Sequence, residues 1–455
     1  MKRRTERLGW LVLGAWALGG CQAAPRGEPQ RAPAPLTSSA PAPSPSLASD
    51  AGPGAGDAAP DAQPAPRAAR PVDRARLQAL VARARSLGTD QLVIWQGGEE
   101  LAAIDARGAP IQTMSITKSV LALAALRLVE AGRLKLEAPV SAHFPEWRAG
   151  DKGAVLVSHL LTHTSGLKEP PATSAIYQQR DFVRFALDSE LTARPGERFV
   201  YGNSASNLLA GVVAQAASQR ADRYVAAQLF KPLGITRWWW SLDRANNAHG
   251  LAGLHMNADG LLRLGQLVLG LGRAPDESGA LSEAGERLIS EPLVTRALTS
   301  LSHPQPPHKR AAWLWWAVPE WTQVWLTRAT LAAWGRAGAP SALVERSKAL
   351  ENERFPSVEA LRVALLAFRP DGVEERAWRA DVWRAGLPEA AYRFGPQVGS
   401  YAAGSLGQYL VVLPQDALIA VRLRRAPQVR QAGDPADFPD FIEAVQALVS
   451  EAPAP

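Results

Sequence analysis

Ser115 and Lys118 are the residue pair best suited to chemistry in this sequence. They lie three positions apart in Ser115-Ile116-Thr117-Lys118, directly before the apolar run 120–126. If a helix begins here, the two side chains lie one turn apart on the same face, so the lysine amine can reach the serine hydroxyl. An amine within reach can take the serine proton, which a hydroxyl nucleophile needs near neutral pH. Backbone N–H groups at the helix start would also stabilise a negatively charged oxygen.

The choice of lysine at position 118 supports this interpretation. The chain contains 42 Arg and 8 Lys, so most of its cationic positions carry arginine. Arginine does not lose its proton in a protein, whereas a partly buried lysine can act as a base. The alternative is an ordinary surface lysine on a helix, because a Ser-x-x-Lys spacing also arises by chance.

Tyr201-Gly202-Asn203 is a second polar group with catalytic potential. It follows the turn 194–197 and precedes the expected helix 207–211. A tyrosine and an asparagine two positions apart in a loop can point into one cleft, where the tyrosine can relay a proton and the asparagine can donate to a carbonyl. A packed tyrosine beside a turn-forming asparagine is the alternative. Glu197 is expected to be a solvated turn residue.

The elements that must position these residues form an α+β pattern. Residues 91–95 and 101–104 have the composition of strands, as do 409–413 and 417–421 near the other end of the chain. The intervening region 134–271 is mostly helical in pattern. We therefore predict one antiparallel sheet that both chain ends complete, flanked by helices and accompanied by a mostly helical region.

The first 72 residues do not fit a folded domain. Residues 1–20 combine four basic residues with the apolar stretch 8–18 and end in Gly19-Gly20, just before Cys21, the only cysteine of the chain. This is the pattern of a secretory signal, and its apolar stretch is too short to span a bilayer well. The Ala/Pro/Ser-rich remainder to residue 72 lacks aromatic residues, so we expect a disordered tether over 21–72 and a folded part over 73–450.

The charge of the chain argues against a nucleic-acid partner. The formal net charge is +7 for 455 residues, and residues 1–20 hold +3 of it. A charge of about +4 on the rest of the chain is modest, and no dense basic run with interleaved aromatic residues is present.

The order Ser-x-x-Lys, then Tyr-x-Asn, resembles the serine β-lactamase-related superfamily: class C β-lactamases, D-alanyl-D-alanine carboxypeptidases and family VIII carboxylesterases. The resemblance covers about 73–316 and 395–449, and it implies the β-lactamase/transpeptidase-like fold. The start of the chain resembles a bacterial lipoprotein signal, in which Cys21 becomes the lipid-modified first residue. Four further segments occur in the family's order: Leu160–Leu167, Phe230–Ile235, Ala252–Gly260 and Gly404–Tyr409.

The resemblance implies a role for each matching residue. Ser115 would be the nucleophile that forms an acyl-enzyme, and Lys118 would share its proton. Tyr201 would act as a base toward Ser115 and as an acid toward the leaving group, and Asn203 would position the substrate and Lys118. The backbone N–H groups of Ser115 and of a residue near Ala403 would form the oxyanion hole. His163 would be structural. This mechanism needs no cofactor and no metal.

The third motif of the family is altered here. It is usually Lys-Thr-Gly or His-x-Gly on the strand that lines the cleft, whereas the matching segment reads Ser400-Tyr401-Ala402-Ala403-Gly404. In β-lactamases and D,D-peptidases the cation of this motif helps to bind the substrate carboxylate. Its absence favours uncharged esters or amides, with Tyr401, Ala403 and Gly404 beside the substrate. Arg393 is a candidate replacement for the cation.

An insertion separates the aromatic segment Trp313–Trp316 from the third motif. Residues 317–392 are helical in pattern and carry five tryptophans: Trp321, Trp325, Trp334, Trp378 and Trp383. We expect these tryptophans to form the core of a small helical cap. The alternative is an aromatic lid or acyl-binding wall over the cleft, because such walls suit apolar substrates.

These observations predict a lipid-anchored serine hydrolase of the bacterial cell envelope. It would be a monomer that cleaves a small ester or amide and is held on the periplasmic face of the outer membrane or on the cell surface. Two alternatives stay open. One is a D,D-carboxypeptidase or weak β-lactamase, and the other is a catalytically silent envelope protein that binds partners through the Trp-rich insertion.

Overall fold

The computed structural model describes residues 69–276, 279–303, 305–306, 308–384, 390–426 and 438–449. The predicted signal, Cys21 and most of the predicted tether lie outside the described residues. No helix within the described ranges is long and apolar enough to cross a membrane.

The end of the predicted tether is attached to the folded body rather than extended. The Arg70 guanidinium forms an ion pair with Asp416 at 2.8 Å, and the Gln96 side chain donates to the Arg70 carbonyl at 2.8 Å. The boundary predicted at residue 72 is therefore wrong by a few residues. Composition alone could not reveal these contacts, because both partners of the 69–72 segment lie far along the chain.

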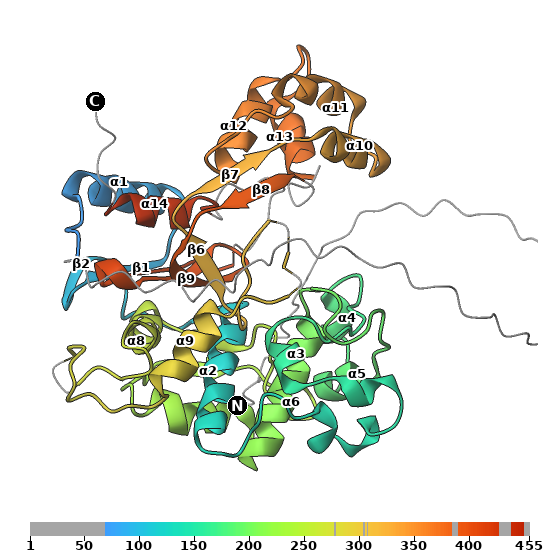
Figure 1. Cartoon of the computed structure of the whole chain (residues 1–455). Coiled ribbons are helices and arrows are strands. Elements are labelled where there is room, and N and C mark those ends of the chain that lie inside the picture. The colour runs from blue at the N-terminus through green and yellow to red at the C-terminus, as the bar shows by residue number, and fades with distance from the viewer. Residues whose placement is uncertain are drawn as a thin grey trace, which may run out of the picture. The chain divides into compact units, whose positions relative to one another are not determined.

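A six-stranded antiparallel sheet forms the centre of the molecule (Figure 1). The first strand of the chain, β1, pairs with the last, β11, from Gln91 opposite Leu423 to Gln96 opposite Leu418. The predicted α+β fold, with a sheet completed by both chain ends, is confirmed. The strands lie in the order β2 (Glu99–Ile104), β1 (Gln91–Gln96), β11 (Leu418–Leu423), β10 (Gln408–Leu413), β9 (Gln397–Gly404) and β6 (Trp316–Pro319).

Helices cover both faces of this sheet. The terminal helices α1 (Arg74–Ser86) and α14 (Phe441–Ala447) pack on one face, and α8 (Ala258–Leu269) and α2 (Ile116–Glu130) pack on the other (Figure 1). Successive side chains of a strand point to opposite faces, so Ile94 joins the core under the terminal helices and Val93 joins the larger core. This is why β1 is apolar along most of its length, and each such buried side chain contributes roughly 1.5–3 kcal/mol.

Helix α2 runs through the middle of the larger core. All residues from Ile116 to Leu126 are buried, which fits a helix that is apolar on every side. Further helices and a small three-stranded sheet surround it: α3 (Val157–Leu161), α4 (Ser174–Tyr177), α5 (Phe182–Asp188), α6 (Asn203–Ala217), α7 (Ala221–Val225), α9 (Glu291–Thr299), β3 (Ile111–Gln112), β4 (Trp238–Trp240) and β5 (Leu254–Met256).

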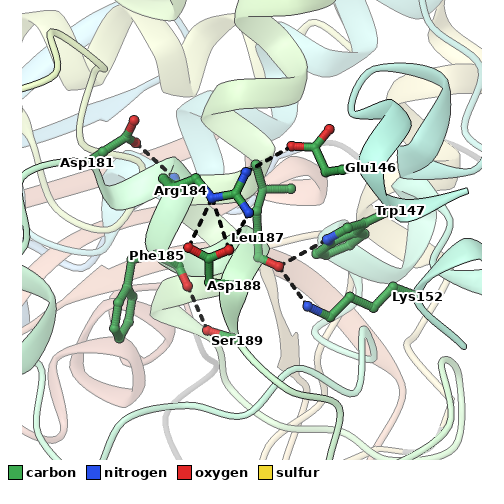
Figure 2. Close-up of polar contacts among 9 residues, drawn as sticks. All are labelled: Glu146, Trp147, Lys152, Asp181, Arg184, Phe185, Leu187, Asp188 and Ser189. Atoms are coloured by element: carbon green, nitrogen blue, oxygen red, sulfur yellow. Dashed lines mark hydrogen bonds and ion pairs between the residues drawn. The ribbon is translucent and has the colours of Figure 1, made fainter. Parts of the chain in front are cut away.

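The end of α5 shows how the helical region is joined together (Figure 2). The last carbonyls of a helix have no partner within it. The carbonyl of Leu187 accepts from the indole of Trp147 at 3.0 Å and from the amine of Lys152 at 2.7 Å. On the helix surface, Arg184 binds Asp188 and also Glu146, the latter at 3.2 Å. These exposed ion pairs contribute little, about 0–1 kcal/mol each.

The insertion folds around a core of its own. Trp334 is fully buried and Trp378 is 2 % exposed, which agrees with the expected helical cap. Trp321 is 40 % exposed, and the side chain of Trp383 lies outside the described residues. The elements of the insertion are β7 (Thr322–Trp325), α10 (Arg328–Arg336), α11 (Ser341–Ser347), α12 (Val358–Ala367), α13 (Glu375–Arg384) and β8 (Ala391–Phe394).

The boundaries of the insertion differ from those predicted. Residues 317–319 belong to β6 of the main sheet, and β7 pairs with β8 to form a two-stranded stalk. The chain leaves and returns at one place, since the Glu320 N–H donates to the Pro396 carbonyl at 2.8 Å. Pairing between segments about 70 residues apart is a long-range feature, which a helical pattern within 317–392 does not reveal.

Candidate active site

Ser115 lies at the start of α2, where the sequence predicted it. Ser115 is the N-cap residue of the helix, and the preceding Met114 has a positive φ of 50° that turns the chain sharply into it. The Lys118 amine donates to the Ser115 hydroxyl oxygen at 3.1 Å. The predicted contact across one helical turn therefore forms.

The Lys118 side chain is 2 % exposed, so its amine must find partners inside the protein. Besides Ser115, the amine donates to the backbone carbonyl of Leu251 at 2.7 Å. In the part of the chain that the structure describes, Lys118 forms no ion pair with a carboxylate.

Tyr201 lies beside the amine rather than in contact with the nucleophile. Its ring centroid is 5.0 Å from Nζ of Lys118, and the residue is 40 % exposed. Within the described residues the Tyr201 hydroxyl makes no hydrogen bond. A hydrogen bond from Tyr201 to Ser115, which the family resemblance implies, is therefore not formed, and among the described side chains Lys118 is the one that hydrogen-bonds the Ser115 hydroxyl.

His163 holds the Tyr201 loop. It adopts a left-handed backbone with a φ of 57°, and its ring centroid lies 4.6 Å from that of Tyr201. Its Nδ1 atom accepts the N–H of Gly202 at 3.1 Å. Burial, assisted by the nearby charge of Lys118, lowers the pKa of His163 to about 3, so the ring is neutral at physiological pH. This geometry favours the structural role expected for His163.

Glu169 anchors the helix that follows Tyr201, and the sequence reasoning missed it. Its carboxylate accepts the N–H of Ser204 at 3.0 Å, at the first turn of α6. A carboxylate at a helix N-terminus satisfies N–H groups that lack partners and interacts favourably with the helix dipole. Burial raises the pKa of Glu169 above its usual value. Because Glu169 lies 35 residues before Ser204, no local pattern could have revealed the contact.

Gly404 brings the edge of the sheet against the nucleophile. A Cβ atom at this position would lie 2.6 Å from the Thr113 carbonyl oxygen and 2.9 Å from the backbone nitrogen of Ser115. Only a glycine lets β9 approach the turn before α2 this closely. Gly404 therefore acts through close packing of the backbone. The neighbouring Ala403 lines the pocket, and the predicted oxyanion hole at this strand stays a prediction.

A pocket of about 280 Å³, which includes open solvent at its mouth, surrounds Ser115 and Lys118. Lys118 is the one charged residue in its lining, and the wall is mainly apolar. The lining residues are Ser115, Lys118, Ser119, His163, Tyr201, Ala311, Ala312, Leu314, Trp315, Trp316 and Ala403.

Three residues predicted to bind the substrate, Asn203, Tyr401 and Gly404, lie outside this lining. The Asn203 amide donates to the Thr173 hydroxyl at 3.2 Å, and no bond joins it to Lys118 within the described residues. Tyr401 is 7 % exposed and belongs to the core under the terminal helices, with its ring centroid 6.4 Å from that of Trp316. Burial raises the pKa of Tyr401 further above its normal value. Tyr401 pairs with Trp316 across the sheet, two positions before Ala403, which shares its face of β9 and lines the pocket.

The aromatic wall comes from a turn within the aromatic segment Trp313–Trp316. Leu314 has a φ of 56°, and the N–H of Ala312 donates to the carbonyl of Trp315 at 2.9 Å. The chain therefore reverses within 312–315, and β6 begins only at Trp316. This reversal places Trp315 and Trp316 in the pocket lining. The Trp316 and Tyr201 rings are nearly parallel, 18° apart, with centroids 6.2 Å from each other.

Arg393 does not replace the cation that the third motif lacks. Arg393, the candidate replacement, is exposed on β8 with its guanidinium over the Trp321 ring, and it does not line the pocket. Lys309 lies closer to the aromatic wall, with its amine 5.0 Å from the Trp316 ring centroid. Burial lowers the pKa of Lys309. Lys309 forms no ion pair or hydrogen bond with any other described residue.

Comparisons with known proteins agree with the site and the fold. A Beta-lactamase family model matches residues 75–430. The chain is 36% identical over 141 residues to Esterase EstB of Burkholderia gladioli, a match that covers 27% of this chain and 36% of the relative. It is 29% identical over 150 residues to Protein flp of Staphylococcus aureus, which covers 31% of this chain and 30% of that protein. The chain thus spans about a third of the length of these curated relatives.

A solved structure shows the same fold over most of the chain. A Bacteroides dorei protein that is taken to be a beta-lactamase superposes with a TM-score of 0.55 at 15% sequence identity, and the match covers 83% of this chain and 99% of that chain. At this identity the likeness concerns the fold alone. Together with the family match over residues 75–430, it shows that the chain belongs to the beta-lactamase family of serine hydrolases.

Proposed function

We propose that this protein hydrolyses a small, uncharged ester or amide through an acyl-enzyme on Ser115. The observation that carries the proposal is the direct 3.1 Å contact between the Lys118 amine and the Ser115 hydroxyl, in a pocket whose wall is mainly apolar. Neutral Lys118 would take the hydroxyl proton as Ser115 Oγ attacks the substrate carbonyl carbon. The negatively charged oxygen would lie near the backbone N–H groups of Ser115 and Ala403.

The later steps can use the same groups. When the tetrahedral intermediate collapses, the bond to the leaving group breaks, and the leaving oxygen or nitrogen takes the proton from Lys118. In this proposal the Tyr201 hydroxyl relays the proton toward the leaving group, and the support is the position of the ring, whose centroid lies 5.0 Å from Nζ of Lys118. Water then attacks the acyl-enzyme with Lys118 as the base, which releases the acid and restores Ser115.

The wall of the pocket suggests the acyl group. The side chains of Leu314, Trp315 and Trp316, with Ala311 and Ala312, offer an apolar surface and no carboxylate or additional cation. Such a surface binds apolar acyl chains without desolvating a charge. We infer that short aliphatic or aromatic acyl groups are preferred.

Intact-protein mass spectrometry after mixing with p-nitrophenyl butyrate tests the proposal. Where hydrolysis of the acyl-enzyme is slower than its formation, we expect the protein to gain the mass of one butyryl group. Ser115→Ala should gain none. Ser347→Ala is the matched control, because Ser347 is a buried serine of the insertion, remote from the pocket. Butyryl transfer that persists in Ser115→Ala would overturn the assignment of the nucleophile.

A D,D-carboxypeptidase or weak β-lactamase is the second candidate. The observation that favours it is Lys309, whose amine lies 5.0 Å from the ring centroid of the pocket residue Trp316 and forms no ion pair with a described residue. Such an amine is suited to a substrate carboxylate. Labelling by a fluorescent penicillin that is lost in Lys309→Met and kept in Lys168→Met, an exposed control, would favour this candidate. If neither esters nor penicillin acylate Ser115, a narrow-specificity amidase, a peptidase or a catalytically silent fold is left.

We also propose that Cys21 carries the lipid anchor of a bacterial envelope protein. The support is the basic start, the short apolar stretch 8–18 and the small residues before the only cysteine. Cys21→Ala should move the protein from the membrane fraction to the soluble fraction. A variant that still fractionates with membranes would contradict the lipidation.

A further inference from the structure

We propose that Asn207 is a positioning residue for Lys118. Asn207 lies in the second turn of α6, is 1 % exposed and is not part of the pocket lining. It acts through the turn 249–252, whose Leu251 carbonyl holds the Lys118 amine. This role rests on the proposed function, because it assigns to Asn207 the placement of the base used in acyl transfer.

The Leu251 carbonyl is the closest contact of the Lys118 amine. Its distance to Nζ is 2.7 Å, compared with 3.1 Å from Nζ to the Ser115 hydroxyl. A long, flexible lysine side chain keeps a fixed position only when its ammonium or amine group is held by directional partners. The position of the amine relative to Ser115 therefore depends on where residue 251 places its carbonyl.

Residue 251 lies in a turn, which does not hold itself in place through helix or strand hydrogen bonds. Asn207 supplies the missing support, because its side-chain oxygen accepts the N–H of Gly250 at 2.8 Å and the N–H of Leu251 at 3.2 Å. These two bonds fix the peptide units directly before the Leu251 carbonyl. The two buried N–H groups would otherwise lack a partner.

The turn rests directly on the helix that carries Asn207. A Cβ atom on Gly250 would lie 2.1 Å from the Ser206 carbonyl oxygen and 2.9 Å from Cα of Asn207. The absence of a side chain at position 250 lets the backbone reach the Asn207 side chain. Helix α6 begins just after Tyr201, so one helix supports the Tyr201 loop at its start and the Lys118 contact one turn later.

The Asn207 side chain uses its acceptor oxygen and not its donor. Its Nδ2 group is buried and has no hydrogen-bond partner among the described residues. A leucine of similar volume would remove this unsatisfied donor but would leave the two N–H groups of the turn without their acceptor. What an asparagine provides here is an acceptor oxygen for two N–H groups of the turn that holds Lys118.

The test compares Asn207→Leu with Asn257→Leu. Asn257 is the matched control, since it is 3 % exposed and its side-chain oxygen accepts a backbone N–H, that of Gly260 at 3.0 Å, at the start of α8. We expect Asn207→Leu to lower kcat for p-nitrophenyl butyrate by about tenfold or more, with KM changed by less than about twofold, because the base is displaced and the pocket wall is not. Asn257→Leu should lower the unfolding temperature similarly and keep kcat.

Rescue separates positioning from packing. Asn207→Asp keeps the acceptor oxygens and should recover part of the kcat that Asn207→Leu loses, although its buried carboxylate adds a charge near Lys118. If Asn207→Leu does not fold, Asn207→Ser, which is smaller and cannot reach both N–H groups, takes its place. An unchanged kcat, or a change in KM alone, overturns the role of Asn207. Absence of Ser115-dependent turnover in the wild type overturns the proposed function and this role with it, so the two failures are distinguishable.

Discussion

The Cβ atom that Gly404 lacks would lie 2.9 Å from the backbone nitrogen of Ser115. Real Cβ atoms do not approach other atoms this closely, so the last residue of β9 and the first residue before α2 are in direct backbone contact. The nucleophile is thus held between a helix start and the edge of a sheet, two elements whose positions the cores on either side determine.

Gly404→Ala should therefore impair catalysis more than folding. The added methyl would have to displace the Thr113–Ser115 turn, at a cost of about 1–3 kcal/mol. We expect kcat/KM for p-nitrophenyl butyrate to fall by about tenfold to a hundredfold, because shifts of an ångström at a reacting group have effects of this size. Gly335→Ala is the control, since position 335 in α10 has open space around it. Full activity in Gly404→Ala would show that the close approach has no catalytic consequence.

Lys118→Arg should be almost as damaging as Ser115→Ala. Arginine keeps the positive charge and can donate to the Leu251 carbonyl, but it cannot accept the Ser115 proton. We expect a loss of kcat of about a thousandfold or more. Stopped-flow measurement of p-nitrophenol release would locate the loss in acylation. An Lys118→Arg enzyme with substantial activity would contradict proton transfer to Lys118.

His163 should make the protein acid-sensitive. Its pKa is lowered from 6.5 to about 3 in the folded state, so the unfolded chain binds a proton that the folded one rejects as the pH falls below 6.5. The contribution of His163 to the free energy of unfolding is therefore fully present above pH 6.5 and is lost as the pH falls toward 3. The loss is about 2–3 kcal/mol at pH 4.5. His163→Asn should have a flatter profile in urea unfolding between pH 7 and pH 4.5, because asparagine tolerates a positive φ and does not titrate.

Other histidines also contribute to the pH dependence of stability, and comparing the wild type with His163→Asn removes their contributions. Burial also lowers the pKa values of His255 and His308 to about 4, and both remain in the variant. The difference between the wild type and His163→Asn therefore isolates His163. Equal slopes would contradict the view that His163 stays neutral in the fold.

Trp334→Ala should damage the insertion and spare the chemistry. Trp334 is fully buried in the core of the insertion, so its truncation should lower the free energy of unfolding of that part by about 3–5 kcal/mol. The pocket lining contains no residue of the insertion. We expect kcat/KM for p-nitrophenyl butyrate to stay within about threefold at 25 °C. A large loss of activity would revive the lid interpretation of the Trp-rich segment.

The sequence predicted those parts of the site that are local. The Ser115–Lys118 contact spans one helical turn, so spacing alone determines it. The burial of Tyr401 was not predictable in this way, because it depends on residues far along the chain. The residue lies in the core under the terminal helices and not in the pocket lining. The Leu251 carbonyl is a backbone atom 133 residues from Lys118, and no residue type could have indicated it.

The remaining differences come from turns and from long-range pairing. The left-handed Leu314 converts the aromatic segment into a reversal, which a run of tryptophans does not suggest. The attachment of Arg70 to Asp416 and the return of the insertion at Pro396 both join residues far apart in the chain. The fold class was accessible nevertheless, because strand-like runs at both chain ends imply a shared sheet whatever their exact pairing.

Hydrolysis of p-nitrophenyl butyrate and of nitrocefin by the protein from Ala69 onward, with Ser115→Ala alongside, tests the central claim most directly. The account predicts ester hydrolysis that Ser115→Ala abolishes, with little or no nitrocefin cleavage, because the pocket lining offers an apolar wall and no cation besides Lys118. Ester hydrolysis that survives in Ser115→Ala, or nitrocefin cleavage faster than ester cleavage, would contradict it.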